Sequence, residues 1–176
     1  METKQTGSHQ TSKNHAVRAV LTQAQTNTTL WIGHLQTDPT DHFAGQTFDC
    51  PAEGPVDNIQ VFTSAVQYPG EMRLTLHEFD PSAKQWGKEI ANSSVNVEKA
   101  DESQWVRFSL QPVMLEKGKT YGFRLKTPNA LIGIGEAASG TKQPFVFGQE
   151  WNADSSNQQG HYFTYFSLAF RVELCA

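Results

Sequence analysis

Two glutamates, Glu136 and Glu150, are the side chains of this sequence best placed for acid–base chemistry. Each ends a short glycine-containing run, residues 133–136 and 148–150. A pair of carboxyl groups about 5 to 10 Å apart can hydrolyse a glycosidic bond. Carboxylates at strand ends also bind loop backbone without any catalytic role. Glycoside hydrolysis therefore ranks third among the functions considered, and no catalytic residue is assigned.

Aromatic residues in or beside polar loops indicate binding without catalysis. Trp86 lies in the polar segment 84–88, and Trp151 leads into the polar segment 152–161. An indole offers a broad apolar face to the C–H groups of a sugar, and neighbouring polar side chains can hydrogen-bond its hydroxyls. The alternative is that each tryptophan only covers the edge of the core. The ligand-binding candidates are Trp86, Trp151, Tyr68, Trp31, Tyr162, Glu150, Asn152 and Asp154.

Aspartates in or beside loops supply oxygen ligands of the kind calcium prefers. They are Asp38, Asp41, Asp49, Asp57 and Asp154. Turn stabilisation accounts for the same residues, so a structural calcium ion is an open expectation and no other cofactor is predicted. His77, Glu78 and Asp80 are close in sequence, but adjacent strand residues point to opposite faces and do not converge on a metal. Motifs of serine hydrolases, zinc proteases and nucleotide-binding loops are missing from the sequence.

The elements that must position these residues show the period-two hydrophobicity of β-strands. In the last run, residues 163–174, one parity is apolar: Phe166, Leu168, Phe170, Val172 and Leu174. Arg73, Thr75 and His77 occupy the outward parity of one earlier run, and Arg124 and Lys126 that of another. One face of each strand is therefore expected in the core and the other in water.

Ten strands are predicted, and no convincing helical pattern interrupts them. They span residues 29–35, 45–50, 58–64, 71–79, 94–97, 105–110, 120–126, 131–136, 145–149 and 162–174. Short strands separated by Pro, Gly, Asp and Asn are typical of all-β proteins. We expect an antiparallel two-sheet β-sandwich with jelly-roll connectivity.

The whole chain of 176 residues suits one domain. Residues 1–14 contain nothing apolar after Met1 and predict a disordered tail. Residues 15–28 form a lead-in, either a short helix or extended chain, and residues 29–176 form the sandwich. Cys50 and Cys175 each end a predicted strand. A disulfide between them and two free thiols both stay open, the free thiols being expected in a cytoplasmic protein.

Charge and hydropathy disfavour two classes of partner. A formal net charge of −4 offers no cationic field for nucleic acid. No apolar run approaches the roughly 20 residues of a membrane-spanning helix. No secretory signal is recognisable, so a cytoplasmic location is the default expectation. Only 18% of residues are charged, and a surface rich in uncharged polar residues is also compatible with export.

The succession of core and turn patterns resembles a known group of domains. The patterns are Gly45-Gln46-Thr47-Phe48, residues 56–61, residues 70–76, and Trp105-Val106-Arg107-Phe108 with residues 113–121. Over residues 43–174 they resemble bacterial jelly-roll accessory domains, similar to carbohydrate-binding modules and galactose-binding-like domains. The resemblance implies a β-sandwich and a non-catalytic module that binds carbohydrate or another polar surface. The alternative is a structural protein that forms an oligomer or a surface assembly.

Overall fold

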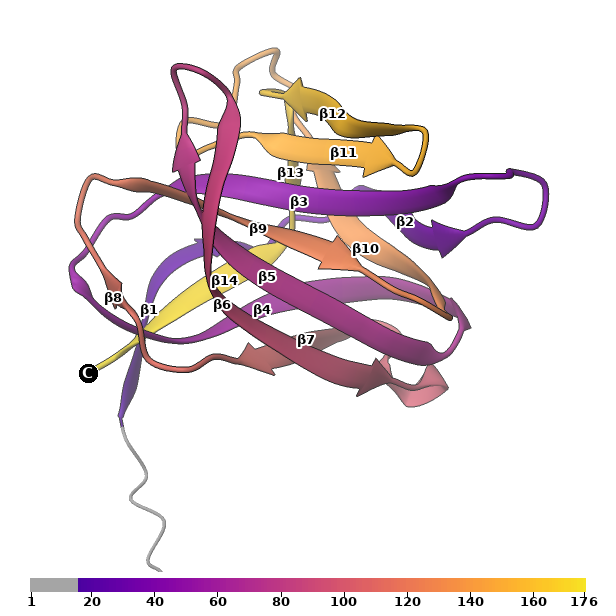
Figure 1. Cartoon of the computed structure of the whole chain (residues 1–176), viewed down its shortest axis with the longest axis horizontal. Coiled ribbons are helices and arrows are strands. Elements are labelled where there is room, and N and C mark those ends of the chain that lie inside the picture. The colour runs from indigo at the N-terminus through magenta and orange to yellow at the C-terminus, as the bar shows by residue number, and fades with distance from the viewer. Residues whose placement is uncertain (1–15) are drawn as a thin grey trace, which may run out of the picture.

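The structure, a computed structural model, describes residues 16–176 and consists of antiparallel strands (Figure 1). Its strands are β1 (Val17–Gln23), β2 (Thr28–His34), β3 (Asp41–Asp49), β4 (Gly54–Tyr68), β5 (Gly70–Asp80), β6 (Gln85–Val97), β7 (Gln104–Ser109), β8 (Met114–Leu115), β9 (Thr120–Lys126), β10 (Leu131–Ala138), β11 (Glu150–Asp154), β12 (Asn157–Phe163), β13 (Phe166–Leu168) and β14 (Phe170–Cys175). Between residues 16 and 176 the only helical element is the single 3-10 turn Lys99–Asp101. The predicted all-β class is confirmed.

One curled sheet folds over to give the sandwich. Its main strand order is β1-β14-β4-β10-β2-β3-β9-β5-β6. Strand β4 is fifteen residues long and changes partner along its length. Residues 56–61 pair with β14, and residues 63–68 pair with β10. The sheet therefore turns at β4, and side chains from both of its halves meet in one core. Jelly-roll connectivity stays a prediction.

Aromatic side chains from distant strands fill the centre of this core. The ring of Phe170 on β14 lies 6.1 Å from Phe48 on β3, 5.7 Å from Phe123 on β9 and 5.7 Å from Phe147 (centroid distances). Tilted and edge-on ring pairs at such distances are favourable beyond the area they bury. Phe170 thus links β14 to the strands of the opposite half of the sheet.

The closing segment is broken, and it keeps the predicted parity only in β14. Before β14, Phe166 is half-buried, whereas Ser167 and Ala169, predicted to face outward, are fully buried. Leu168, Phe170, Val172 and Leu174 are all fully buried, as the period of two predicts. Strand β13 pairs with β10, whereas β14 pairs with β4. The change occurs at Ala169, whose amide donates to the Gly135 carbonyl and whose carbonyl accepts from the Phe62 amide. A single strand over residues 162–174 is wrong because the chain exchanges one partner strand for another at this residue.

Two other segments bear on the predicted elements: a predicted strand that is a loop, and the lead-in, whose conformation the sequence left open. Residues 145–149 form a loop, although the carbonyls of Phe147 and Gln149 accept hydrogen bonds from β3. A Cβ atom at Gly148 would lie 1.9 Å from the Thr47 carbonyl oxygen, so this loop approaches β3 too closely for regular pairing. In the lead-in the chain is extended: β1 pairs with β14, and the sheet begins at Val17 rather than near residue 29. The tail predicted for residues 1–14 lies outside the described residues.

Residues 16–176 include no helical segment with the length and hydrophobicity of a membrane span.

Candidate functional site

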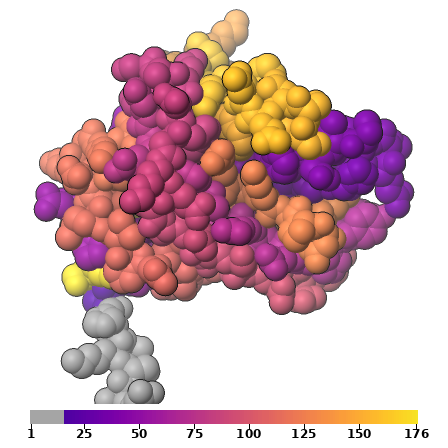
Figure 2. Space-filling model, viewed as in Figure 1, coloured from indigo at the N-terminus to yellow at the C-terminus, as the bar shows by residue number. Residues whose placement is uncertain are grey.

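Two hairpins that are far apart in sequence enclose a cleft of about 450 Å³. One is the β5–β6 hairpin, and the other is the β11–β12 hairpin. In Figure 1 the β5–β6 hairpin stands upright and the β11–β12 hairpin runs across the view beside it, and their surfaces meet in Figure 2. The cleft is lined by Ala83, Lys84, Gln85, Trp86, Gln158, Gln159, Gly160 and Tyr162. It therefore combines two aromatic side chains with three side-chain amides.

Trp86 is held in place by a cluster of aromatic rings. Its ring centroid lies 5.4 Å from Trp151, 5.2 Å from Phe79 and 5.6 Å from His77, in edge-on arrangements. Phe79 in turn lies 5.7 Å from Tyr162. The two aromatic walls of the cleft thus rest on a common support, which limits the ordering cost of binding a ligand between them.

Arg124 on β9 extends this cluster across the face of the sheet. Its guanidinium carbon lies 4.9 Å from the centroid of Trp86 and 5.8 Å from that of Trp151, within cation–π range. It also donates to His77 Nε2 at 3.3 Å, while His77 Nδ1 lies 3.2 Å from the Gly87 carbonyl oxygen. Nδ1–H therefore donates to Gly87, and Nε2 is the acceptor of a neutral imidazole.

Burial and the adjacent Arg124 charge hold the pKa of His77 below its ordinary value. Both causes favour the neutral ring that the hydrogen bonds require. Burial likewise lowers the pKa of Arg124, which is half-buried under the two indoles. The cation beside Trp86 is thus fixed in position and only partly hydrated.

Trp151 lies beneath the cleft rather than in its wall. It is 1% exposed, and its indole N–H donates to the Gln159 carbonyl at 2.8 Å. This hydrogen bond ties β11 to the loop side of β12. The contribution of Trp151 is therefore to support Trp86 and the Gln159 backbone, since a ligand in the cleft does not reach its ring.

Trp31 and Tyr68 lie in a different hollow, of about 250 Å³. Tyr68 is 42% exposed, and its hydroxyl accepts from Gln36 Nε2 at 3.1 Å. Trp31 also borders a second hollow, of about 260 Å³, together with Asn152 and Asp154. The structure thus distributes the eight candidates over several places and brings only Trp86 and Tyr162 together in the walls of the large cleft.

Glu150 and Glu136 meet inside the protein. They are 1% and 7% exposed, and Glu150 Oε2 has no hydrogen-bond partner within residues 16–176. Burial raises the pKa of Glu150 well above its usual range, and the neighbouring Glu136 carboxyl raises it further. Glu150 is therefore protonated at neutral pH. Neither carboxyl lines the clefts described above, so a glycosidic bond bound there does not contact them.

The loop aspartates considered for calcium hydrogen-bond to protein groups. Asp38 accepts from Thr40, and Asp154 accepts from Ser156 and Asn157. The remaining three contact partners as follows: Asp41 with His34, Asp49 with Thr120, and Asp57 with Arg107 and Asn58. Over the part of the chain that the structure describes, no three His, Cys, Asp or Glu side chains converge as metal ligands. Calcium binding stays a prediction.

The two cysteines are free thiols. Cys50 is buried, and its Sγ donates to the Ala52 carbonyl, whereas Cys175 is partly exposed at the end of β14. Burial raises the pKa of Cys50 above its ordinary value. A neutral, buried thiol of this kind is a poor nucleophile.

Sequence reasoning did not single out the polar partners in this region as site residues. Gln85, Gln158 and Gln159 lie at or beside hairpin turns, and Arg124 was placed only on the outward parity of its strand. Strand parity predicts only that Arg124 faces outward from the sheet. The contact with Trp86 depends on the packing of the β5–β6 hairpin over β9.

Comparisons with known proteins bear on the fold. No protein-family model matches the sequence, and no curated protein matches it. Among solved structures, the chain is similar to a clostridial cysteine protease, Cwp84 after propeptide cleavage, with a TM-score of 0.58 and 9% sequence identity. The match covers 91% of this chain and 40% of that protein, so this chain corresponds to less than half of the protease's length. At this identity the likeness shows a shared β-fold alone.

Proposed function

We propose that this protein is a non-catalytic module that binds carbohydrate in the cleft between the β5–β6 and β11–β12 hairpins. The observation that carries the proposal is the meeting of Trp86 and Tyr162 with the amides of Gln85, Gln158 and Gln159 around one cleft. Aromatic faces suit the C–H surface of a sugar ring, and amides both donate to and accept from its hydroxyls.

The packing that holds the Trp86 ring in place further supports a binding role. Trp151 and Phe79 support its ring at edge-on contacts of 5.4 and 5.2 Å. A preformed aromatic wall retains more of its contact energy on binding than a mobile one. The buried position of Glu136 and Glu150 supports a binding role rather than hydrolysis in this cleft.

A glycan array followed by calorimetry tests the proposal. We expect the wild type to bind a subset of glycans and Trp86→Ala to weaken that binding about tenfold or more, since a stacked aromatic contributes about 1 kcal/mol beyond its buried area. Gln158→Ala, at an exposed position of β12 beside the hairpin turn, should weaken binding without a change in melting temperature.

Trp105→Ala is the matched control, because Trp105 is a half-buried tryptophan on β7 that packs against Phe62 and Arg171, outside the cleft. Binding should survive this change. A wild type that binds no glycan, or binding that persists in both Trp86→Ala and Tyr162→Ala, contradicts the proposal.

A further inference from the structure

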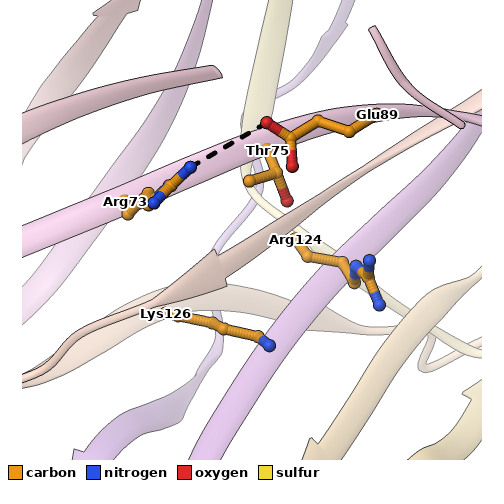
Figure 3. Close-up of a pocket in the computed structure, with 5 residues that line it drawn as sticks. All are labelled: Arg73, Thr75, Glu89, Arg124 and Lys126. Atoms are coloured by element: carbon orange, nitrogen blue, oxygen red, sulfur yellow. Dashed lines mark ion pairs between the residues drawn. The ribbon is translucent and has the colours of Figure 1, made fainter. Parts of the chain in front are cut away.

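The face of the sheet that carries Arg124 also holds a cationic hollow of about 280 Å³. Figure 3 shows the side chains that line it. Its lining residues are Arg73, Thr75, Glu89, Arg124 and Lys126. The register of β5 and β9 explains the cluster: Arg73 lies opposite Lys126, and Thr75 lies opposite Arg124. Side chains on one parity of paired strands face the same side. Two neighbouring strands thus place three cations around one hollow.

These cations are poorly neutralised. Glu89 is the one carboxylate of the lining, and it contacts Arg73 at 3.9 Å. Within residues 16–176, no carboxylate lies within 4.0 Å of Arg124 or Lys126. This local excess of positive charge occurs in a chain whose net charge is −4.

Mutual repulsion accompanies this excess. Burial, Arg124 and Arg73 together lower the pKa of Lys126. Like charges directly opposite each other on paired strands, as Arg73 and Lys126 are, destabilise a sheet. An anion in the hollow would convert this repulsion into attraction.

Arg124 provides a preorganised donor at the hollow. Its guanidinium is held against Trp86 and Trp151 and donates to His77. Its buried Nε has no hydrogen-bond partner in the described chain. Guanidinium groups bind carboxylate and sulfate through paired N–H donors, and a buried donor without a partner is costly.

We infer that this hollow is an oxyanion-binding site that takes a carboxylate or sulfate group through Arg73, Arg124 and Lys126. Because Arg124 lies against the cleft residue Trp86, one ligand can occupy both places. Resting on the proposed function, the inference is that the bound carbohydrate is acidic, with its ring at Trp86 and Tyr162 and its anionic group at Arg124.

Calorimetry with three probes tests the site and separates the source of the anion. Oligogalacturonate presents both sugar rings and carboxylates, its fully methyl-esterified form presents the rings alone, and sodium sulfate presents an oxyanion alone. We expect oligogalacturonate to bind about tenfold or more tightly than the ester, as is usual for charge-assisted hydrogen bonds. Its affinity should fall with added sodium chloride.

Variants at the cationic lining assign the effect to the hollow. Lys126→Gln and Arg73→Gln should each weaken oligogalacturonate binding several-fold and leave ester binding unchanged. Glu89→Gln should tighten oligogalacturonate binding, because it removes the one carboxylate of the hollow. Lys117→Gln, an equal change of charge at an exposed turn, is the matched control and should have no effect.

The outcomes separate this inference from the proposed function. Sulfate binding that depends on Lys126 and Arg73, without glycan binding, supports the oxyanion site with a free anion as ligand and contradicts the carbohydrate proposal. Equal affinity for oligogalacturonate and its ester, with no sulfate binding, overturns the oxyanion site and leaves the carbohydrate proposal standing. Oligogalacturonate binding that is unchanged in Lys126→Gln and Arg73→Gln also overturns it.

Discussion

At the scale of single residues, Glu150 has the environment least suited to its charge. It is 1% exposed, it adjoins Glu136, and no described cation lies within ion-pair distance of either carboxyl. A buried carboxyl beside another one keeps its proton, because ionisation would leave an uncompensated charge in the interior. The folded protein therefore holds a proton on Glu150 that the unfolded chain releases near pH 4.5.

This difference predicts how stability depends on pH. Since the pKa of Glu150 is raised in the folded state, its contribution to stability is complete below about pH 4.5 and decreases as pH rises toward the folded-state pKa. The decrease is at most about 1.4 kcal/mol per pH unit. Glu150→Gln removes it. We compare the unfolding free energy of Glu150→Gln with that of wild type at each pH. We expect this difference to be about 1–3 kcal/mol more favourable to the variant at pH 8 than at pH 4.

Urea denaturation at pH 4, 6 and 8 measures this effect, with exposed Glu53→Gln as the control. If the stability difference between Glu150→Gln and wild type does not change with pH, Glu150 does not hold a proton in the folded protein.

At the scale of elements, a glycine on β9 makes room for the ring of Trp86, although β5 lies between β9 and the tryptophan's own strand β6 in the sheet. A Cβ atom at Gly122 would lie 2.7 Å from Trp86 Cζ3 and 2.9 Å from Cη2. The indole of the β5–β6 hairpin therefore lies directly on the backbone of β9. Arg124, two residues further along β9, lies beside the same ring.

Gly122→Ala should displace the Trp86 ring from the sheet. We expect a loss of about 1–3 kcal/mol in stability, because the added methyl group overfills a packed contact. Glycan binding should weaken, by no more than in Trp86→Ala, although Gly122 itself does not line the cleft.

Gly140→Ala is the matched control, since a Cβ atom there meets nothing within 4 Å. Melting temperatures and glycan titrations of both variants measure the effect. Wild-type affinity in Gly122→Ala would show that the position of Trp86 does not matter for binding.

At the scale of the whole molecule, the closing strand joins the two halves of the curled sheet. Phe170 is fully buried and contacts rings from β3, β9 and the loop before β11. Tyr165, in the bend between β12 and β13, is 47% exposed. The two aromatic residues therefore differ in burial although they lie in the same segment.

Phe170→Ala should destabilise the whole fold by about 3–5 kcal/mol, the usual cost of a phenylalanine-sized cavity in a core. Tyr165→Ala should change stability by about 0.5 kcal/mol or less, as exposed substitutions do. Chemical denaturation followed by tryptophan fluorescence measures both. Similar losses in the two variants would contradict the assignment of Phe170 to a shared core.

Local patterns in the sequence predicted much of the fold. The alternation of Phe170, Val172 and Leu174 determines which face of β14 is buried, because a strand has a period of two whatever its partner. Parity failed just before β14, where Ser167 and Ala169 are buried together with Leu168. For the same reason, Arg73 and Arg124 lie on the predicted face of the sheet. The expectation that this face meets water is wrong for His77, which is 3% exposed, and Arg124 is half-buried, because Trp86 of the β5–β6 hairpin packs against both. The predicted strand over residues 145–149 failed because an apolar run does not reveal how closely its backbone approaches β3.

By itself the sequence determined strand parity, the all-β class and the presence of aromatic residues among polar loops. Tertiary structure alone decided that Trp86 and Tyr162 share a cleft, that Trp151 and Glu150 lie beneath the surface, and that Arg73 and Lys126 face each other. The physical reason is that parity is a property of each strand, whereas these contacts depend on strand pairing and hairpin packing between segments dozens of residues apart.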